Sequence, residues 1–139
     1  KRKTMFFKTI ALAYLFISLS ACQLVSPIFV DYHGVRRDVA QWINQQTLLS
    51  MQQKRSLAQL SKAQQKLVNI DGIASDSKLS IAKENAIAMH CAQLHLTEFK
   101  ITQLQSQVFA SPAEQNRILE KYDREFPKLK LDPGLIQCE

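Results

Sequence analysis

The chain has 139 residues, of which 46% are hydrophobic and 22% charged, and a formal net charge of +6. Four of its 18 Lys and Arg residues lie in the first eight positions, which leaves 14 basic against 12 acidic residues, a net +2, beyond them. Because nucleic-acid binding needs a basic face that neutralises phosphates, this balance excludes a nucleic-acid partner. Only three glycines and four prolines occur, and no strand-like alternation is present, so an all-α fold is predicted.

The first 21 residues have the anatomy of an export signal. A basic start precedes a short apolar core, and small residues then lead to a cysteine in the run Leu19-Ser20-Ala21-Cys22. This run resembles the cleavage box of bacterial lipoproteins. The resemblance implies that Cys22 is lipidated on its thiol, freed by cleavage and acylated on its new amino group. Acyl chains such as palmitate would then anchor the protein to a membrane surface.

An uncleaved membrane helix is the alternative, because Ile10 to Val30 is long enough to span a hydrocarbon core of about 30 Å. Gln23, Pro27 and three serines within that stretch favour cleavage instead. Gln23 also stands where enterobacterial lipoproteins retained in the inner membrane have aspartate. The resemblance therefore implies an outer-membrane lipoprotein that faces the periplasm.

The rest of the chain is expected to form one domain. We predict a signal peptide over 1–21, a lipid-proximal tether over 22–33 and a single α-helical periplasmic domain over 34–139. The first helix of that domain is indicated by residues three and four positions apart, which are the apolar Val35, Val39, Trp42 and Ile43 followed by Gln46. Its apolar stripe could pack on the rest of the domain or on a second copy, so a homodimer is compatible with the pattern.

A second helix is predicted to begin at Ser50, where Gln53 completes a reciprocal capping box, although one helix running straight through is the alternative. Asp71 and Gly72 are expected to break this helix, and the pair Ser75-Asp76 to cap the next one. The apolar stripe of the second helix consists of Leu57, Leu60, Ala63, Leu67 and Ile70.

The strongest periodic pattern is a seven-residue repeat, which predicts a long helix packed lengthwise on another as an antiparallel hairpin. Its members are Ile87, Leu94, Ile101 and Val108. Ser111 then caps a shorter third helix, with Pro112 at its first position and Glu114 closing a second capping box. Pro127 ends that helix, and the tail over 128–139 has no helical register.

Once Cys22 carries lipid, Cys91 and Cys138 are the two remaining cysteines. Exported domains form and keep disulfides, so we predict a bond between these two residues. A continuous helix from Cys91 to Val108 rises about 26 Å, and an antiparallel third helix returns about 20 Å, so the tail restarts near Cys91. The rival is a zinc or copper site made by Cys91, His95 and Cys138, with His90 nearby.

Mass spectrometry of the purified protein separates these two interpretations. The disulfide predicts a mass two hydrogens lower than that of the reduced protein. Free thiols with a bound metal would instead establish the metal site.

No catalytic constellation is recognised. The chain has no glycine-rich phosphate loop, zinc-helix motif or nucleophile elbow, and its three histidines have no evident nucleophile beside them. Glu120, Asp123 and Glu125 alternate with basic residues, as on a solvated helix face. We therefore expect no enzyme activity and no cofactor.

Two short motifs resemble those of small periplasmic helical proteins of the Spy and CpxP type, which include metal sensors and chaperones. That family carries two Leu-Thr-x-x-Gln motifs, each at the start of a helix. Leu49, Ser50 and Gln53 match the first copy, with serine for threonine, whereas Ser111 and Glu114 match the second, which lacks its leucine and has glutamate for glutamine. The resemblance implies a helical cradle, often dimeric, that binds partly unfolded envelope proteins or senses envelope stress.

A second hypothesis is a lipoprotein that docks one specific partner, such as a pilotin or an accessory subunit of an envelope or secretion complex. Pilotins share the small, helical, lipid-anchored and disulfide-bonded architecture, but no motif connects them to this chain. Both hypotheses predict an envelope protein as partner.

Overall fold

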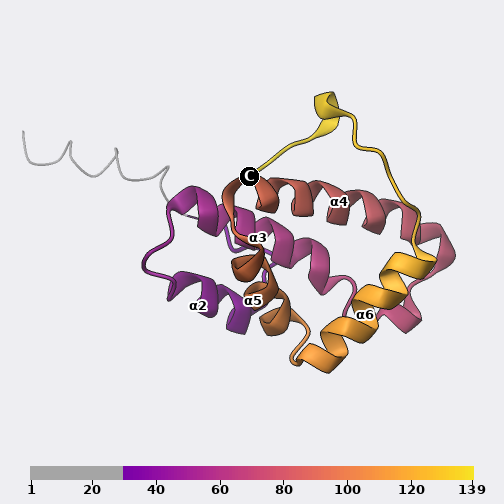
Figure 1. The fold of residues 1–139 in the computed structure, drawn as a ribbon, viewed down its shortest axis with the longest axis horizontal. Coiled ribbons are helices and arrows are strands. Elements are labelled where there is room, and N and C mark those ends of the chain that lie inside the picture. The colour runs from indigo at the N-terminus through magenta and orange to yellow at the C-terminus, as the bar shows by residue number, and fades with distance from the viewer. Residues whose placement is uncertain (1–29) are drawn as a thin grey trace, which may run out of the picture.

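Five α-helices, connected by short links, make up the computed structural model, which describes residues 30–139 (Figure 1). Cys22 and the predicted signal peptide lie outside the described residues. The helices are α2 (Arg37–Asn44), α3 (Met51–Gln65), α4 (Lys78–His95), α5 (Glu98–Val108) and α6 (Pro112–Glu125), with 3-10 turns η2 (Ile70–Gly72), η3 (Ser75–Ser77) and η4 (Pro133–Leu135). No strand occurs within these described residues, and the predicted all-α class is confirmed.

The centre of the fold is the antiparallel hairpin of α3 and α4 (Figure 1). All five residues of the predicted apolar stripe of the second helix are buried, with at most 4% of their surface exposed. Opposite them α4 contributes small side chains, which let the two helices approach closely. The Asn85 Nδ2 donates a hydrogen bond of 3.1 Å to the backbone oxygen of Ala63 and so ties the helices together at mid-length. The α4 residues buried in this core are Ala82, Ala88, Cys91 and Ala92.

Helices α2 and α5 cover one side of α3 (Figure 1). Val39 and Ile43 of α2 are fully buried, so the predicted stripe of the first helix packs within the same chain. The Arg36 guanidinium donates hydrogen bonds of 2.9 and 3.2 Å to the backbone oxygens of Gln107 and Val108. A cation at these carbonyls stabilises the negative end of the α5 dipole, and it fixes α2 against α5.

The predicted capping box at the start of α3 is confirmed. The Ser50 Oγ accepts a bond of 3.1 Å from the Gln53 backbone N–H, and the Gln53 Oε1 accepts one of 2.9 Å from the Ser50 N–H. Residues 45–50 separate α2 from α3 without forming a helix, so the alternative of one continuous helix is wrong. Gln53 also donates through Nε2 to the backbone oxygen of His95, which joins the start of α3 to the end of α4.

The expected single helix through the seven-residue repeat is wrong, because α4 ends at His95 and α5 begins at Glu98. Leu96 and Thr97 are extended, and the Thr97 hydroxyl caps α5 by accepting from the Lys100 N–H at 3.3 Å. A β-branched residue with a hydroxyl favours such a cap over a helix interior. The repeat is therefore divided between two helices, and its member Leu94 is 61% exposed.

Two expected caps differ from the structure. Ser111 caps α6 by accepting from the Glu114 N–H at 3.2 Å, but the Glu114 carboxylate pairs with Arg117 instead of the Ser111 N–H, so this capping box is only half formed. The Ser111 N–H donates to the Phe109 backbone oxygen because the preceding turn brings them together. Ser75 and Asp76 form turn η3 and do not cap α4, which begins only at Lys78.

We expect Ser50→Ala to lower the free energy of unfolding by about 1 kcal/mol, the usual cost of losing a helix N-cap. Urea denaturation followed by circular dichroism measures this loss. Ser80→Ala is the matched control, because Ser80 is an exposed residue within α4, where alanine is a good helix former. Equal stabilities of the two variants would contradict the capping role of Ser50.

Candidate functional site

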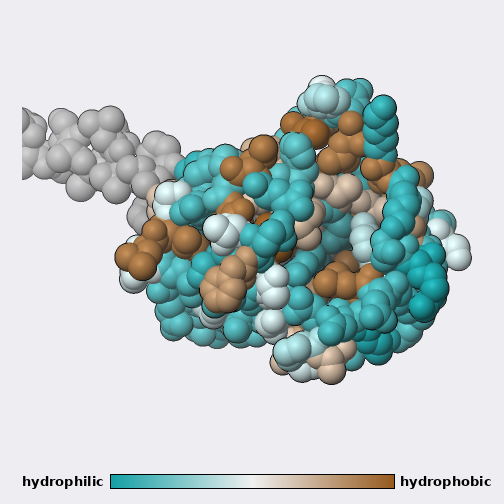
Figure 2. Space-filling view, viewed as in Figure 1, coloured by the Kyte–Doolittle hydropathy of each residue, from teal (hydrophilic) through white to brown (hydrophobic). Residues whose placement is uncertain are grey.

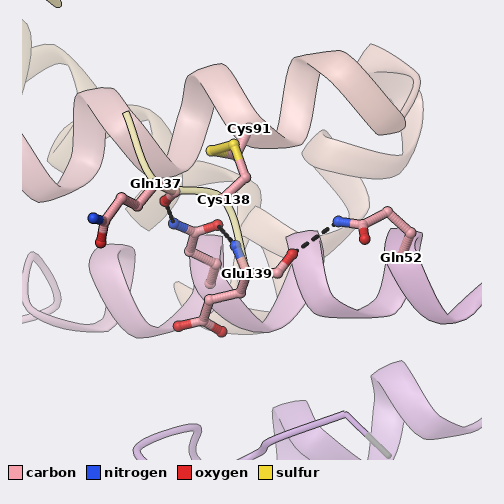
Figure 3. The surroundings of a disulfide bond; sticks show 6 residues. Gln52, Cys91, Gln137, Cys138 and Glu139 are labelled. Atoms are coloured by element: carbon pink, nitrogen blue, oxygen red, sulfur yellow. Dashed lines mark hydrogen bonds between the residues drawn. A yellow bond between two sulfur atoms is a disulfide. The ribbon is translucent and has the colours of Figure 1, made fainter. Parts of the chain in front are cut away.

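The C-terminal tail is held against the α3–α4 hairpin by the disulfide between Cys91 and Cys138, whose Cα atoms are 5.5 Å apart. Figure 3 shows hydrogen bonds that flank the bridge. The Gln59 side chain donates to the Gln137 backbone oxygen at 2.9 Å and accepts from the Glu139 N–H at 3.1 Å. Gln52 donates to the Glu139 oxygen at 2.8 Å, and Lys62 pairs with the Glu139 carboxylate at 3.0 Å.

The predicted pairing of the cysteines is confirmed, but the expected route of the chain is not. The expected route follows one helix from Cys91 to Val108, whereas the chain turns at Leu96 and Thr97. After α6 the tail passes outward through η4 and returns to the C-terminal end of α4 (Figure 1). The tail is long enough to make this arc, so the pairing did not depend on a straight helix.

The tail and the hairpin enclose a groove of about 580 Å³. Lys66 and Glu84 form an ion pair across its rim, one from each helix of the hairpin. Ile87 and Leu135 provide apolar lining on opposite sides, from α4 and from the tail. The groove therefore combines a charged ion pair with an apolar lining.

The alternative metal site does not form in this structure. Both sulfur atoms are used in the Cys91–Cys138 bond, which removes the two thiolates that such a site requires. His95 contacts Gln53 through its backbone oxygen. Among residues 30–139, no three His, Cys, Asp or Glu side chains lie close enough together to hold a metal ion.

The clustered charges of α6 form ion pairs at the surface. Arg117 pairs with Asp71 at 3.1 Å and with Glu114 at 2.6 Å, and Lys121 also contacts Asp71. The hydrogen bonds from Lys121 and Arg117 lower the pKa of Asp71, and the bond from Arg117 lowers that of Glu114. The same two carboxylates raise the pKa of Arg117. Asp71 therefore joins η2 to α6, whereas Glu114 pairs within α6.

Two of the acidic residues expected on a solvated helix face also form ion pairs at the surface. Glu125 pairs with Lys78 at 3.6 Å and with Lys121 at 3.9 Å, and Asp123 contacts Lys128.

The motif residues of the family resemblance are placed at helix starts. Leu49 packs on the core, Ser50 and Gln53 begin α3, and Ser111 and Glu114 begin α6.

One end of the molecule exposes large apolar side chains that the sequence did not single out as a surface. Leu48 is 98% and Phe99 70% exposed, and with Leu94 they lie in or beside the links between α2 and α3 and between α4 and α5. The two links are adjacent, because Lys100 Nζ donates to Gln46 Oε1 at 3.0 Å. We call these three residues, Leu48, Leu94 and Phe99, the apolar end. Figure 2 shows apolar side chains exposed on this part of the surface.

The sequence carries one signal for the apolar end. Thr97 followed by Glu98 is an N-cap followed by an acidic residue in the first helical turn. Recognising this cap would have ended the long helix at His95 and shifted the α5 register. Phe99 would then have been placed on the outer face of the new helix.

No family model, no curated protein and no solved structure matches this chain. Within residues 30–139, no helix combines the length and the apolarity needed to cross a membrane.

We expect Cys138→Ala to release the tail and to lower the free energy of unfolding by up to about 4 kcal/mol, because the bridge closes a long loop. Hydrogen exchange should become faster at residues 129–139, while α3 and α4 keep their protection. Gln59→Ala is the comparison, because it removes two tail hydrogen bonds and leaves the bridge, at a cost of about 1 kcal/mol per bond. Unchanged exchange in the tail of Cys138→Ala would contradict this role of the disulfide.

Proposed function

We propose that this chain is a lipoprotein, anchored to the outer membrane through acyl chains on Cys22, whose helical domain binds envelope proteins without enzyme activity. The cleavage box before Cys22 supports the anchor, and the disulfide between Cys91 and Cys138 suits an oxidising compartment such as the periplasm. The surface ion pairs that occupy Asp71, Glu114 and Glu125 support a binding role over acid catalysis.

The apolar end is the observation that carries this proposal. Phe99 and Trp42 line the same shallow hollow, and the Lys100 ammonium lies 5.8 Å from the centre of the Trp42 ring. Exposed Leu48 and Phe99 side chains stand on links that are fixed by side-chain hydrogen bonds, so the surface is held in shape before a partner arrives. Aromatic side chains in such a preformed patch are typical anchors for binding another protein.

Chaperone-like binding of several clients, as in the Spy and CpxP family, is the first form of this function. A patch of separate apolar side chains among polar residues can hold many different unfolded segments weakly. The resemblance at Ser50 and Ser111 supports this form only through the order of two helix starts.

Docking of one specific partner, as by a pilotin or an accessory subunit, is the second form. The groove beneath the tail favours it, because the disulfide and the Lys62–Glu139 ion pair give this surface one shape. A surface of fixed shape and mixed charge selects among partners better than a loose apolar patch does.

Photo-crosslinking in cells tests the proposal and separates its two forms. A photoreactive phenylalanine analogue at position 99 should capture envelope proteins, as many bands for a chaperone or as one dominant band for a docking subunit. Replacing Leu48 and Phe99 together by serine should reduce capture through a crosslinker at Leu94 by about tenfold, because truncation of an apolar anchor costs roughly 1–2 kcal/mol.

The matched control carries the same crosslinker at Asn116, an exposed position on α6 away from the apolar end. Capture at position 99 that does not exceed capture at position 116 would contradict the binding role. Cys22→Ser tests the anchor separately: it should abolish incorporation of labelled palmitate and move the protein from the membrane to the soluble fraction.

A further inference from the structure

The described chain begins close to the apolar end. The Tyr32 hydroxyl donates a hydrogen bond of 3.3 Å to the side chain of Asn44, the last residue of α2, and Val30 packs on the core. The Lys54 ammonium of α3 donates to the Asn44 backbone oxygen at 3.2 Å, so the start of α3 meets the same point. Figure 1 shows the start of the described chain beside the link between α2 and α3, which carries Leu48. The sequence that precedes Val30 is therefore attached to the domain at this end.

The proposed lipid anchor is only a short stretch of chain away. Cys22 precedes Val30 by eight residues, which span at most about 29 Å when fully extended. Acyl chains on Cys22 would lie in the membrane, so Val30 would stay within about this distance of the lipid surface. Because the connection is made beside the apolar end, it keeps this end close to the lipid, rather than α6 or the tail.

The exposed side chains at this end suit contact with lipid. Leu48, Leu94 and Phe99 are large and mostly exposed to solvent. Apolar side chains that enter the boundary between headgroups and acyl chains leave water, which drives interfacial binding. Trp42 lines the same hollow as Phe99, and tryptophan is enriched at this boundary in membrane proteins. The apolar end therefore has the composition of an interfacial membrane contact.

The charges around the apolar end favour an anionic lipid surface. Residues 44–56 and 91–102, which comprise the two links and the adjoining helical turns, carry Lys54, Arg55 and Lys100 against Glu98, a net +2. Lys54 and Lys100 donate to backbone or amide oxygens and to no carboxylate within residues 30–139. In contrast α6, at the opposite end of the molecule in Figure 1, carries four acidic and three basic residues. A negatively charged surface would therefore attract the apolar end in preference to α6.

We propose that the apolar end rests on the anionic lipid surface to which Cys22 is anchored while no protein partner is bound. Leu48, Leu94 and Phe99 enter the boundary between headgroups and acyl chains, and the neighbouring ammonium groups contact lipid phosphates. This inference rests on the proposed anchor and deepens the proposed function, because lipid and protein partner use the same side chains. A partner takes the apolar end by displacing lipid, and the membrane keeps this surface covered until then.

Tryptophan fluorescence tests the contact, because Trp42 is the only tryptophan of the chain and reports on this end alone. The acylated protein is purified from membranes and reconstituted in vesicles of phosphatidylcholine and phosphatidylglycerol in equal amounts, with or without bromine on the upper part of the acyl chains. Bromine quenches tryptophan on contact, so brominated vesicles should quench Trp42. The quenching should decrease when phosphatidylglycerol is omitted or when salt is added, since salt screens exposed charges.

A matched pair of leucine variants separates docking from simple proximity to the membrane. Leu48→Ser should lower the ratio of docked to free domain at least about tenfold, the effect expected when one large apolar side chain no longer leaves water. Leu48 is 98% exposed, so its replacement leaves the core intact. Leu79→Ser is the control, because Leu79 is 59% exposed at the start of α4, away from the two links, and its replacement should leave the quenching unchanged.

The outcomes distinguish this inference from the proposed function. Trp42 emission that brominated lipids leave unchanged, or equal quenching in Leu48→Ser and Leu79→Ser, would overturn the inference, and capture of envelope proteins at position 99 in cells would still support the binding function. Quenching of Trp42 without any such capture would establish the membrane contact and contradict the protein partner. Mass spectrometry of the same preparation reports the acyl chains, and their absence from Cys22 would overturn both the anchor and this inference.

Discussion

The packing of α3 against α4 is the constraint on which the rest of the structure depends. Leu57 and Leu60 of α3 are fully buried, and alanines on α4 let the helix axes approach each other. Cys91 lies in this same interface, so the position of the tail is decided by the hairpin. The disulfide does not create the core. It attaches to the core a segment with few buried residues of its own, and thereby forms the groove.

The break at Leu96 and Thr97 gives the molecule its second layer. A continuous helix would have carried Ile101 and Val108 away from the hairpin, whereas the turn returns them to bury against α3 and α2. The turn also leaves Leu94 and Phe99 exposed, so the same event that completes the core produces the apolar end. The Arg36 guanidinium donates hydrogen bonds to the last backbone carbonyls of α5. Polar contacts as well as apolar burial therefore fix this arrangement.

Two surfaces result from this construction. The apolar end lies at the links between α2 and α3 and between α4 and α5, whereas the groove lies between the tail and the α3–α4 hairpin. The ion pairs between η2 and α6 hold α6 in place through Asp71. These ion pairs are exposed, so they orient α6 more than they stabilise the fold.

The sequence by itself determined the helical class, the α3 stripe, the cap at Ser50, the end of α6 before Pro127 and the pairing of Cys91 with Cys138, because each depends on local periodicity, local capping or the small number of cysteines. It did not determine where the helix through the seven-residue repeat ends, since the spacing from Leu94 to Ile101 across the break is the same as elsewhere in the repeat. Only the tertiary structure decided that Leu94 faces solvent, that Asp71 pairs with Arg117, and that the buried Gln64 Oε1 has no hydrogen-bond partner among residues 30–139. Those outcomes depend on which distant segments meet, and the spacing of residues along one helix carries no information about the neighbour across from it.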